Sequence, residues 1–396
     1  MKTVSMQAFS GISRTIVRAL IGVACLALLL PAHAVAQSRL TGTVFDAKTG
    51  RPLSNVNVFL DGTTLGSATG EQGQFTVSGI PPGSYTVVVS RISYQSKTRT
   101  VHLRDTTRTL TFELQPKSIR LKGVTVKESR ETWLDRLDRF RDGFFGDVRQ
   151  AQFCEFVNPE VLSFQKSNGT LVAHAKRPLR IRNAALGYEV TYHVSRYVVS
   201  SETRRRYGHF EFDPLEAESK RQRQEWVRAR RRTYQGSFRH FIHALEAGTL
   251  KSEGFEVYWT SSSPTTRDHQ LGEGGGLAGS VEPVSKATNI TESATGASRL
   301  ILTVPRGEFL EVRFVLEGES QRFARRYRGG DARSMQVSWI DVFGGTRVVV
   351  DTQSGAFVRR NWMGFGNYVL RGYWGWAETA ATALPANYRP PGAPGA

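Results

Sequence analysis

The stretch of sequence that decides the fold runs from residue 38 to residue 115 and begins Leu40-Thr-Gly-Thr-Val44, Asp46-Ala-Lys-Thr-Gly50 and Val56-Asn-Val-Phe-Leu60. It continues with Gly73-Gln-Phe75-Thr-Val77, Ile80-Pro-Pro-Gly83 and Tyr85-Thr-Val-Val-Val89. Apolar, often β-branched residues alternate with polar ones, which is the period of a half-buried strand. Glycine and proline between the apolar runs favour turns. Short strands separated by turns predict a β-sandwich, and Phe75 is expected in its core.

These motifs resemble the carboxypeptidase-regulatory-like module, a transthyretin-like β-sandwich found at the N-termini of exported Bacteroidota-type proteins. The resemblance covers residues 38–115, about a fifth of the chain. It implies a seven-stranded Greek-key sandwich in an exported protein. It implies no activity, because one fold serves many functions. Ligand or carbohydrate binding is one interpretation of the module, and a spacer that carries the next domain is the simpler one.

Residues 1–36 have the three-part layout of a secretory signal peptide. Three cations without an acid precede the apolar run Ala19–Leu30, and Pro31-Ala-His-Ala-Val-Ala36 supplies small residues for cleavage after Ala36. The apolar run is too short to span a membrane as a helix. We therefore expect an exported protein that is periplasmic or associated with the outer membrane.

The chain is strongly basic, with a formal charge of +18. Removal of residues 1–36, which hold three of the cations, leaves an excess of +15. For an exported chain, this excess favours anionic envelope partners such as lipopolysaccharide or acidic glycans over nucleic acid. Four arginines are candidate anion-binding residues, although a solvated helix face is the ordinary interpretation of such a run. They are Arg228, Arg230, Arg231 and Arg232.

The remaining sequence predicts a mainly β protein with two helical segments. A linker strand and a charged helix are expected over residues 116–145, and an antiparallel β-rich domain over residues 146–376. Within that domain, Asn168-Gly169 predicts a hairpin turn, and the pattern from Pro214 to Gly248 predicts helices. A low-complexity loop is expected at residues 260–298 and a flexible tail at residues 377–396. Strands 300–304 and 309–316 are expected to flank a turn at Arg306-Gly307, and the strands from residue 337 to residue 362 are expected to form a meander. The phrase Pro178–Tyr188 is similar to a segment of uncharacterised envelope proteins.

The sequence contains no recognisable catalytic or cofactor motif. It has neither the Gly-x-Ser-x-Gly elbow of hydrolases nor a phosphate-binding glycine loop. His243-Ala-Leu-Glu246, with His240 one turn earlier, has the spacing of a zinc pair, but no third ligand can be named. We therefore predict no metal, no cofactor and no catalytic residue. Cys154, the one cysteine left after signal cleavage, is expected to be a buried filler.

The last strands are rich in aromatic residues that could stack on sugars. Core packing is the alternative interpretation of this group. The aromatic group comprises Trp362, Phe365, Tyr368, Tyr373, Trp374 and Trp376, and the candidates for ligand stacking are Trp362, Tyr368, Tyr373 and Trp374.

Two functions of different classes remain open. The first is a non-enzymatic envelope protein whose sandwich presents a β-rich domain that binds a glycan, a lipid or a protein. The second is a hydrolase, carboxypeptidase-related or other, with an unrecognised site in residues 146–376. Convergent acids in a pocket would favour the hydrolase, and an aromatic or basic face would favour binding.

Overall fold

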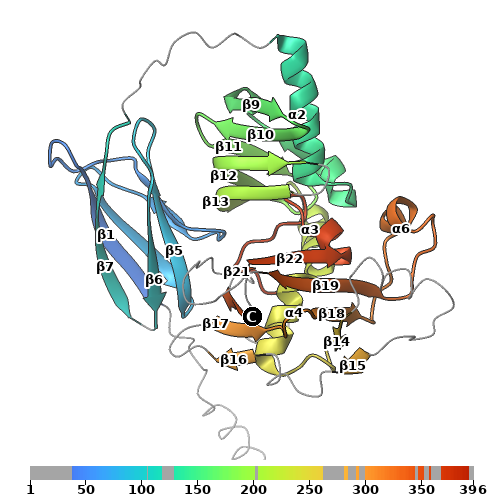
Figure 1. Cartoon of the computed structure of the whole chain (residues 1–396). Helices are drawn as coiled ribbons and strands as arrows, with labels where there is room; N and C mark the ends of the chain where they lie inside the picture. Colours follow the sequence, from blue (N-terminus) through green and yellow to red (C-terminus); the bar gives the residue numbers. More distant parts are fainter. Residues whose placement is uncertain are drawn as a thin grey trace, which may run out of the picture. The chain divides into compact units, whose positions relative to one another are not determined.

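The computed structural model is mainly β (Figure 1). It describes residues 38–104, 106–117, 129–200, 204–261, 281–283, 291–293, 299–343, 347–351, 356–357 and 367–391. The expected signal peptide, the linker strand near residues 119–126 and Trp362 lie outside these ranges. No helix within the described residues is long and apolar enough to cross a membrane.

The N-terminal part is the predicted seven-stranded sandwich. Its strands are β1 (Ser38–Asp46), β2 (Asn57–Leu60), β3 (Gly66–Ala68), β4 (Gln74–Ile80), β5 (Gly83–Ser90), β6 (Lys97–Leu103) and β7 (Thr107–Leu114). They form one sheet in the order β4-β1-β7 and a second in the order β3-β2-β5-β6. The inward residues of both sheets form one core, in which Phe75 is 3% exposed and packs near Phe112 with the two rings tilted. The predicted fold and core residue are confirmed.

A six-stranded antiparallel sheet and helix α2 (Arg130–Phe145) follow. The remaining elements of this part are η1 (Arg149–Phe153), β8 (Cys154–Phe156), η2 (Pro159–Val161), β9 (Leu162–Ser167), β10 (Thr170–Ala175), β11 (Leu179–Asn183), β12 (Tyr188–Val199) and β13 (Arg204–Pro214). Asn168 and Gly169 both have positive φ, as the predicted two-residue hairpin between β9 and β10 requires. Figure 1 shows α2 beside this sheet. Phe140 and Phe144 of α2 pack in its core, and Cys154 is buried as predicted.

The two helices that follow are α3 (Lys220–Tyr234) and α4 (Phe238–Ala247), and α3 begins later than predicted. Pro214 is the last residue of β13, where it lies opposite Tyr188 of β12. The pairing with β12 therefore keeps residues 204–214 extended, and the Ser219 side chain caps α3 by accepting from the Gln222 amide. Gly248 ends α4 in the left-handed conformation, as the sequence predicted.

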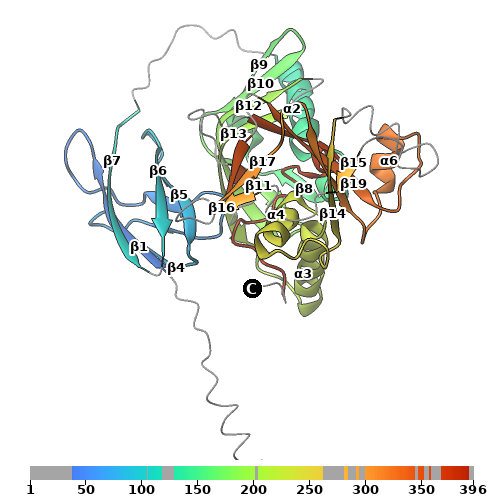
Figure 2. The same ribbon diagram turned by 60° about the horizontal axis from the view of Figure 1, so that its bottom comes forward.

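The last strands form two sheets, and the expected meander is wrong. One sheet has the order β15-β14-β18-β19-β22 and the other β16-β17-β20-β21. The strands on either side of the Arg306-Gly307 turn, β17 and β18, therefore do not pair, and of the expected meander only β20 and β21 pair with each other, because β19 lies in the other sheet. Both sheets bury apolar residues against α4, because Leu302 of β17 and Leu310 of β18 belong to one core with Phe241 of α4. Figure 2 shows α4 beside strands of both sheets. Two short strands lie within the expected low-complexity loop. The elements are β14 (Phe255–Thr260), β15 (Val281–Pro283), β16 (Thr291–Ser293), β17 (Arg299–Thr303), β18 (Phe309–Phe314), α6 (Gln321–Tyr327), β19 (Gln336–Phe343), β20 (Arg347–Asp351), β21 (Ala356–Phe357), β22 (Asn367–Gly372) and α7 (Tyr373–Ala377).

The segment after α7 is packed rather than loose. We expected a flexible tail at residues 377–396, but the structure buries Ala381 and Leu384 in the core beneath the six-stranded sheet. The Asn183 side chain also donates to the Ala381 carbonyl over 3.0 Å. The high content of Pro, Gly and Ala led us to expect a loose segment. The small alanine side chains instead allow the backbone to approach the sheet closely.

Candidate functional site

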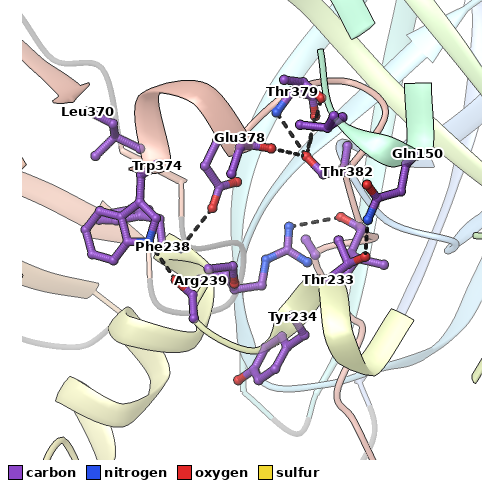
Figure 3. A pocket seen from close by; sticks show the side chains of 18 of the residues that line it. Gln150, Thr233, Tyr234, Phe238, Arg239, Leu370, Trp374, Glu378, Thr379 and Thr382 are labelled. Carbon is purple, nitrogen blue, oxygen red and sulfur yellow. Dashed lines mark hydrogen bonds between the residues drawn. The ribbon is translucent and has the colours of Figure 1, made fainter. Parts of the chain in front are cut away.

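A cavity of about 860 Å³ lies where several segments of the chain meet, including residues 148–150 and Glu317. Its walls come from β13, the α3–α4 junction, the segment from Tyr368 to Ala386, and strands β5 and β6 of the sandwich. Figure 3 shows how Glu378, Arg239 and the Gln150–Thr233 pair reach it from different segments. The volume falls within the usual range for small-molecule sites.

Glu378 is the most buried acid of this cavity. It directly follows α7, and its Oε1 accepts from the backbone N–H of Phe238 over 2.8 Å, at the start of α4. A carboxylate at this position compensates the unpaired amides and the positive end of the helix dipole. Burial nevertheless raises the pKa of Glu378, against the opposing effects of this hydrogen bond and of Arg239 and Arg206.

Arg239 is the cation beside Glu378, and it fixes the C-terminal segment. Its guanidinium donates to the Leu384 carbonyl over 2.9 Å and to the Pro385 carbonyl. Burial lowers the pKa of Arg239 to about 10, so the side chain stays charged at neutral pH. The planar fork of an arginine suits two adjacent carbonyl acceptors. Arg239 therefore holds one wall of the cavity in place.

An aromatic wall completes the cavity. Trp374 is buried and donates its indole N–H to the Gly236 carbonyl over 2.7 Å. Trp376 is 7% exposed and packs against Tyr373 and Phe323. Its indole N–H has no acceptor among the residues that the structure describes. A buried donor without an acceptor costs about 1–3 kcal/mol. Trp376 belongs to the lining of the cavity, whereas its N–H itself is enclosed by the protein.

The sandwich contributes to the cavity through the turn after β2. The Gly62 amide donates to the Phe210 carbonyl over 2.6 Å, and the Phe212 amide donates to the Thr63 carbonyl over 3.0 Å. Asp61 accepts from the Phe210 amide over 2.9 Å and lies 2.7 Å from Nδ1 of His209. The turn thus covers the free edge of β13, which would otherwise expose unpaired backbone groups.

The four candidate arginines do not form one anion-binding patch. Arg230 donates to the carbonyls of Leu186 and Gly187 and lies over the ring of Tyr188, so it supports the fold. Arg228 is exposed on α3 and does not line either cavity. Arg231 lines a smaller cavity of about 370 Å³, and Arg232 lines the large one.

The candidate stacking aromatics are mainly packing residues. Trp374 lies in the core with Phe238 and Phe241. Tyr373 contacts Phe323, and burial raises its pKa to about 12. Tyr368, Tyr373 and Trp374 all line the cavity, but Trp374 offers it little surface.

The two histidines considered for zinc lie beside the smaller cavity. His240 contacts Glu253 over 3.1 Å, and Nδ1 of His243 lies 2.6 Å from the Tyr234 hydroxyl. Within the described residues, no group of three metal-ligating side chains converges. Ser84 and His102 lie 2.6 Å apart, but they are direct neighbours across β5 and β6. A hydrogen bond between cross-strand neighbours is an ordinary feature of a sheet.

Sequence reasoning missed Glu378 and Arg239. Neither residue lies in a motif, and only the fold brings the end of α7 to the start of α4. The one available signal was Ser237 before an apolar helical stripe, which marks a helix start that attracts a carboxylate. Trp376 did belong to the aromatic group that the sequence singled out.

Replacing Glu378 with glutamine is expected to make the free energy of unfolding less sensitive to pH. The folded state raises the pKa of this carboxyl above its ordinary value of 4.5, so folding favours its protonated form. Stability from this group is therefore present below pH 4.5 and is lost as pH rises through the folded pKa. Glutamine keeps the acceptor for Phe238, so the variant should gain stability relative to the wild type as pH rises. Urea unfolding of both proteins from pH 4 to pH 8 measures this, and a constant difference would contradict it.

The sandwich belongs to a known family. The model of the CarboxypepD_reg-like domain matches residues 40–126. This part of the chain is a CarboxypepD_reg-like domain. No curated protein matches the chain.

Comparison with solved structures finds similarity at the level of single β domains. BcpA, the major pilin subunit of Bacillus cereus, is 17% identical with a TM-score of 0.20, over 21% of this chain and 31% of BcpA. A type II cohesin–X-dockerin complex from Acetivibrio cellulolyticus is 17% identical with a TM-score of 0.19, over 25% of this chain and 71% of that chain. Catechol 1,2-dioxygenase from an Acinetobacter species is 14% identical with a TM-score of 0.19, over 25% of this chain and 59% of the dioxygenase. The match thus spans about a third of the length of BcpA.

Proposed function

We propose that the chain is an exported, non-enzymatic envelope protein that binds a glycan in the large cavity. In this proposal the CarboxypepD_reg-like domain is one wall of the binding site rather than a spacer. The three-part signal layout of residues 1–36 supports export. The cavity of about 860 Å³, with aromatic and polar side chains in its lining, is the observation that carries binding.

The lining chemistry favours binding over catalysis. Aromatic side chains, hydroxyls and amides surround the cavity, which is the usual composition of a site that recognises a polar ring. Glu378, the most buried acid, is committed to the Phe238 amide and to fixing the start of α4. A general acid or base must instead reach the proton that it transfers.

A hydrolase is the second candidate, and one observation favours it. Glu317 and Glu378 both line the cavity, and burial raises the pKa of each. Raised carboxyl pKa values are typical of general acids in glycoside hydrolysis. A screen for reaction products must therefore accompany every binding measurement.

The test compares two variants of strand β6. Thr100 is exposed on β6 and lines the cavity, whereas Thr98 is exposed on the same face but does not line it. Calorimetric titration of residues 37–396 with a panel of neutral and acidic mono- and disaccharides should reveal binding to one site. Thr100→Trp should weaken that binding at least tenfold, because the indole enters the cavity, and Thr98→Trp should leave it unchanged.

Three outcomes would count against the proposal. Failure of every panel member to bind, or equal binding by the two variants, would overturn the cavity as the site. Release of new reducing ends during incubation, abolished in a Glu378→Gln variant, would establish the hydrolase instead.

A further inference from the structure

We infer that the ligand of the large cavity is an anionic saccharide, with its carboxylate or phosphate held by Arg149, Arg206 and Arg232. This inference rests on the proposed function and names the class of ligand. It depends on two independent features: the arginines in the cavity lining, and the amide, hydroxyl and aromatic side chains beside them.

The three arginines have charge available for a ligand. Arg149, Arg206 and Arg232 are exposed and line the cavity, and in the described part of the chain none of them forms an ion pair with an acid. Among the described residues, the one side-chain hydrogen bond of these arginines joins Arg206 to the backbone carbonyl of Glu378, over 3.3 Å. Arginine presents a planar fork of donors that matches a carboxylate or a phosphate. The lining thus supplies several suitable donors for one anion.

Three acids also line the cavity, and two of them already have hydrogen-bond partners, so they neutralise little of the positive charge of the arginines. Asp61 is occupied by His209 and by the Phe210 amide. Glu378 is occupied by the Phe238 amide. Glu317 remains, and burial raises its pKa against the opposing effect of Arg232. The cavity is therefore better prepared for an anion than for a cation.

The second feature indicates a ligand with ring hydroxyls rather than an acyl chain. Hydroxyls and ring oxygens exchange hydrogen bonds with polar side chains, which a hydrocarbon cannot do. The Gln150 side chain and Thr233, which contact each other over 3.1 Å, also line the cavity and can bond to hydroxyls. Tyr373 and Trp376 add apolar ring surface of the kind on which sugars pack.

The experiment titrates residues 37–396 with D-glucose, D-glucuronic acid and D-glucose 6-phosphate. Both anionic sugars should bind at least tenfold more tightly than D-glucose at low ionic strength, and their affinity should fall as salt is added. The stronger of the two identifies carboxylate or phosphate as the preferred group. Arg149→Gln, Arg206→Gln and Arg232→Gln should each weaken the anionic sugars about tenfold and leave D-glucose unaffected. Arg228→Gln, on the same helix as Arg232 but outside the cavity lining, should change nothing.

The failures of the two proposals are distinguishable. Equal affinity for all three sugars, or no effect of the three arginine variants, would overturn the anionic ligand while leaving the cavity as a glycan site. Absence of binding by all three sugars, and by the wider panel, would overturn both proposals together.

Discussion

Replacing Arg239 with leucine is expected to lower the free energy of unfolding by about 3–5 kcal/mol. The variant loses two charge-assisted hydrogen bonds, to the carbonyls of Leu384 and Pro385, each worth about 1.5–3 kcal/mol. It also removes the cation that lies beside Glu378. Because Arg239 holds the wall formed by residues 378–386, the same change should abolish ligand binding. Urea unfolding and sugar titration of one preparation measure both effects.

Two further variants control this prediction. Arg223→Leu alters an exposed arginine of α3, and its free energy of unfolding should stay within about 0.5 kcal/mol of the wild-type value. Arg239→Lys keeps the charge but loses the forked guanidinium group. Its free energy of unfolding should therefore lie between those of the wild type and Arg239→Leu. A loss below about 1 kcal/mol in Arg239→Leu would show that the C-terminal segment is held by other contacts.

Arg313→Met is also expected to cost about 3–5 kcal/mol, the range for removing one partner of a buried ion pair. Glu311 is 0% exposed, and its Oε1 accepts from Nε of Arg313 over 2.8 Å and lies 2.6 Å from the Nη2 atom. Trp339 donates its indole N–H to the other oxygen over 3.2 Å. Without Arg313, the fully buried carboxylate loses its cation. Urea unfolding of the variant at neutral pH measures this cost.

The double variant Glu311→Met/Arg313→Met separates the ion pair from the packing around it. Replacing both partners with apolar residues of similar size often leaves the free energy of unfolding nearly unchanged. The double variant should therefore recover most of the stability that Arg313→Met loses. A double variant at least as unstable as Arg313→Met would mean that packing of the Arg313 side chain against Tyr258, 4.2 Å away, dominates the effect.

The features that the sequence predicted are those set by neighbouring residues. The hairpin at Asn168-Gly169 and the end of α4 at Gly248 depend on a few local φ values, so they could be predicted. The late start of α3 could not, because Pro214 is compatible with either a helix or a strand end. Only the pairing of β13 with β12 selects the strand.

Features that depend on long-range packing could not be predicted. β17 and β18 are neighbours in sequence but belong to different sheets, because α4 is covered by both. The candidate site shows the same limit. The sequence identified the aromatic group that includes Trp376, but Glu378 and Arg239 become neighbours only when α7 meets the start of α4.

The most direct test of the cavity as a ligand site is the indole signal of Trp376 in the NMR spectrum of protein labelled with ¹⁵N-tryptophan. Trp376→Phe assigns this signal, and Trp339, whose N–H is bonded to Glu311, serves as the internal control. We expect titration with D-glucuronic acid to shift the Trp376 signal in a saturable manner while the Trp339 signal stays in place. An unchanged Trp376 signal at saturating ligand, or an equal shift of both signals, would contradict the account.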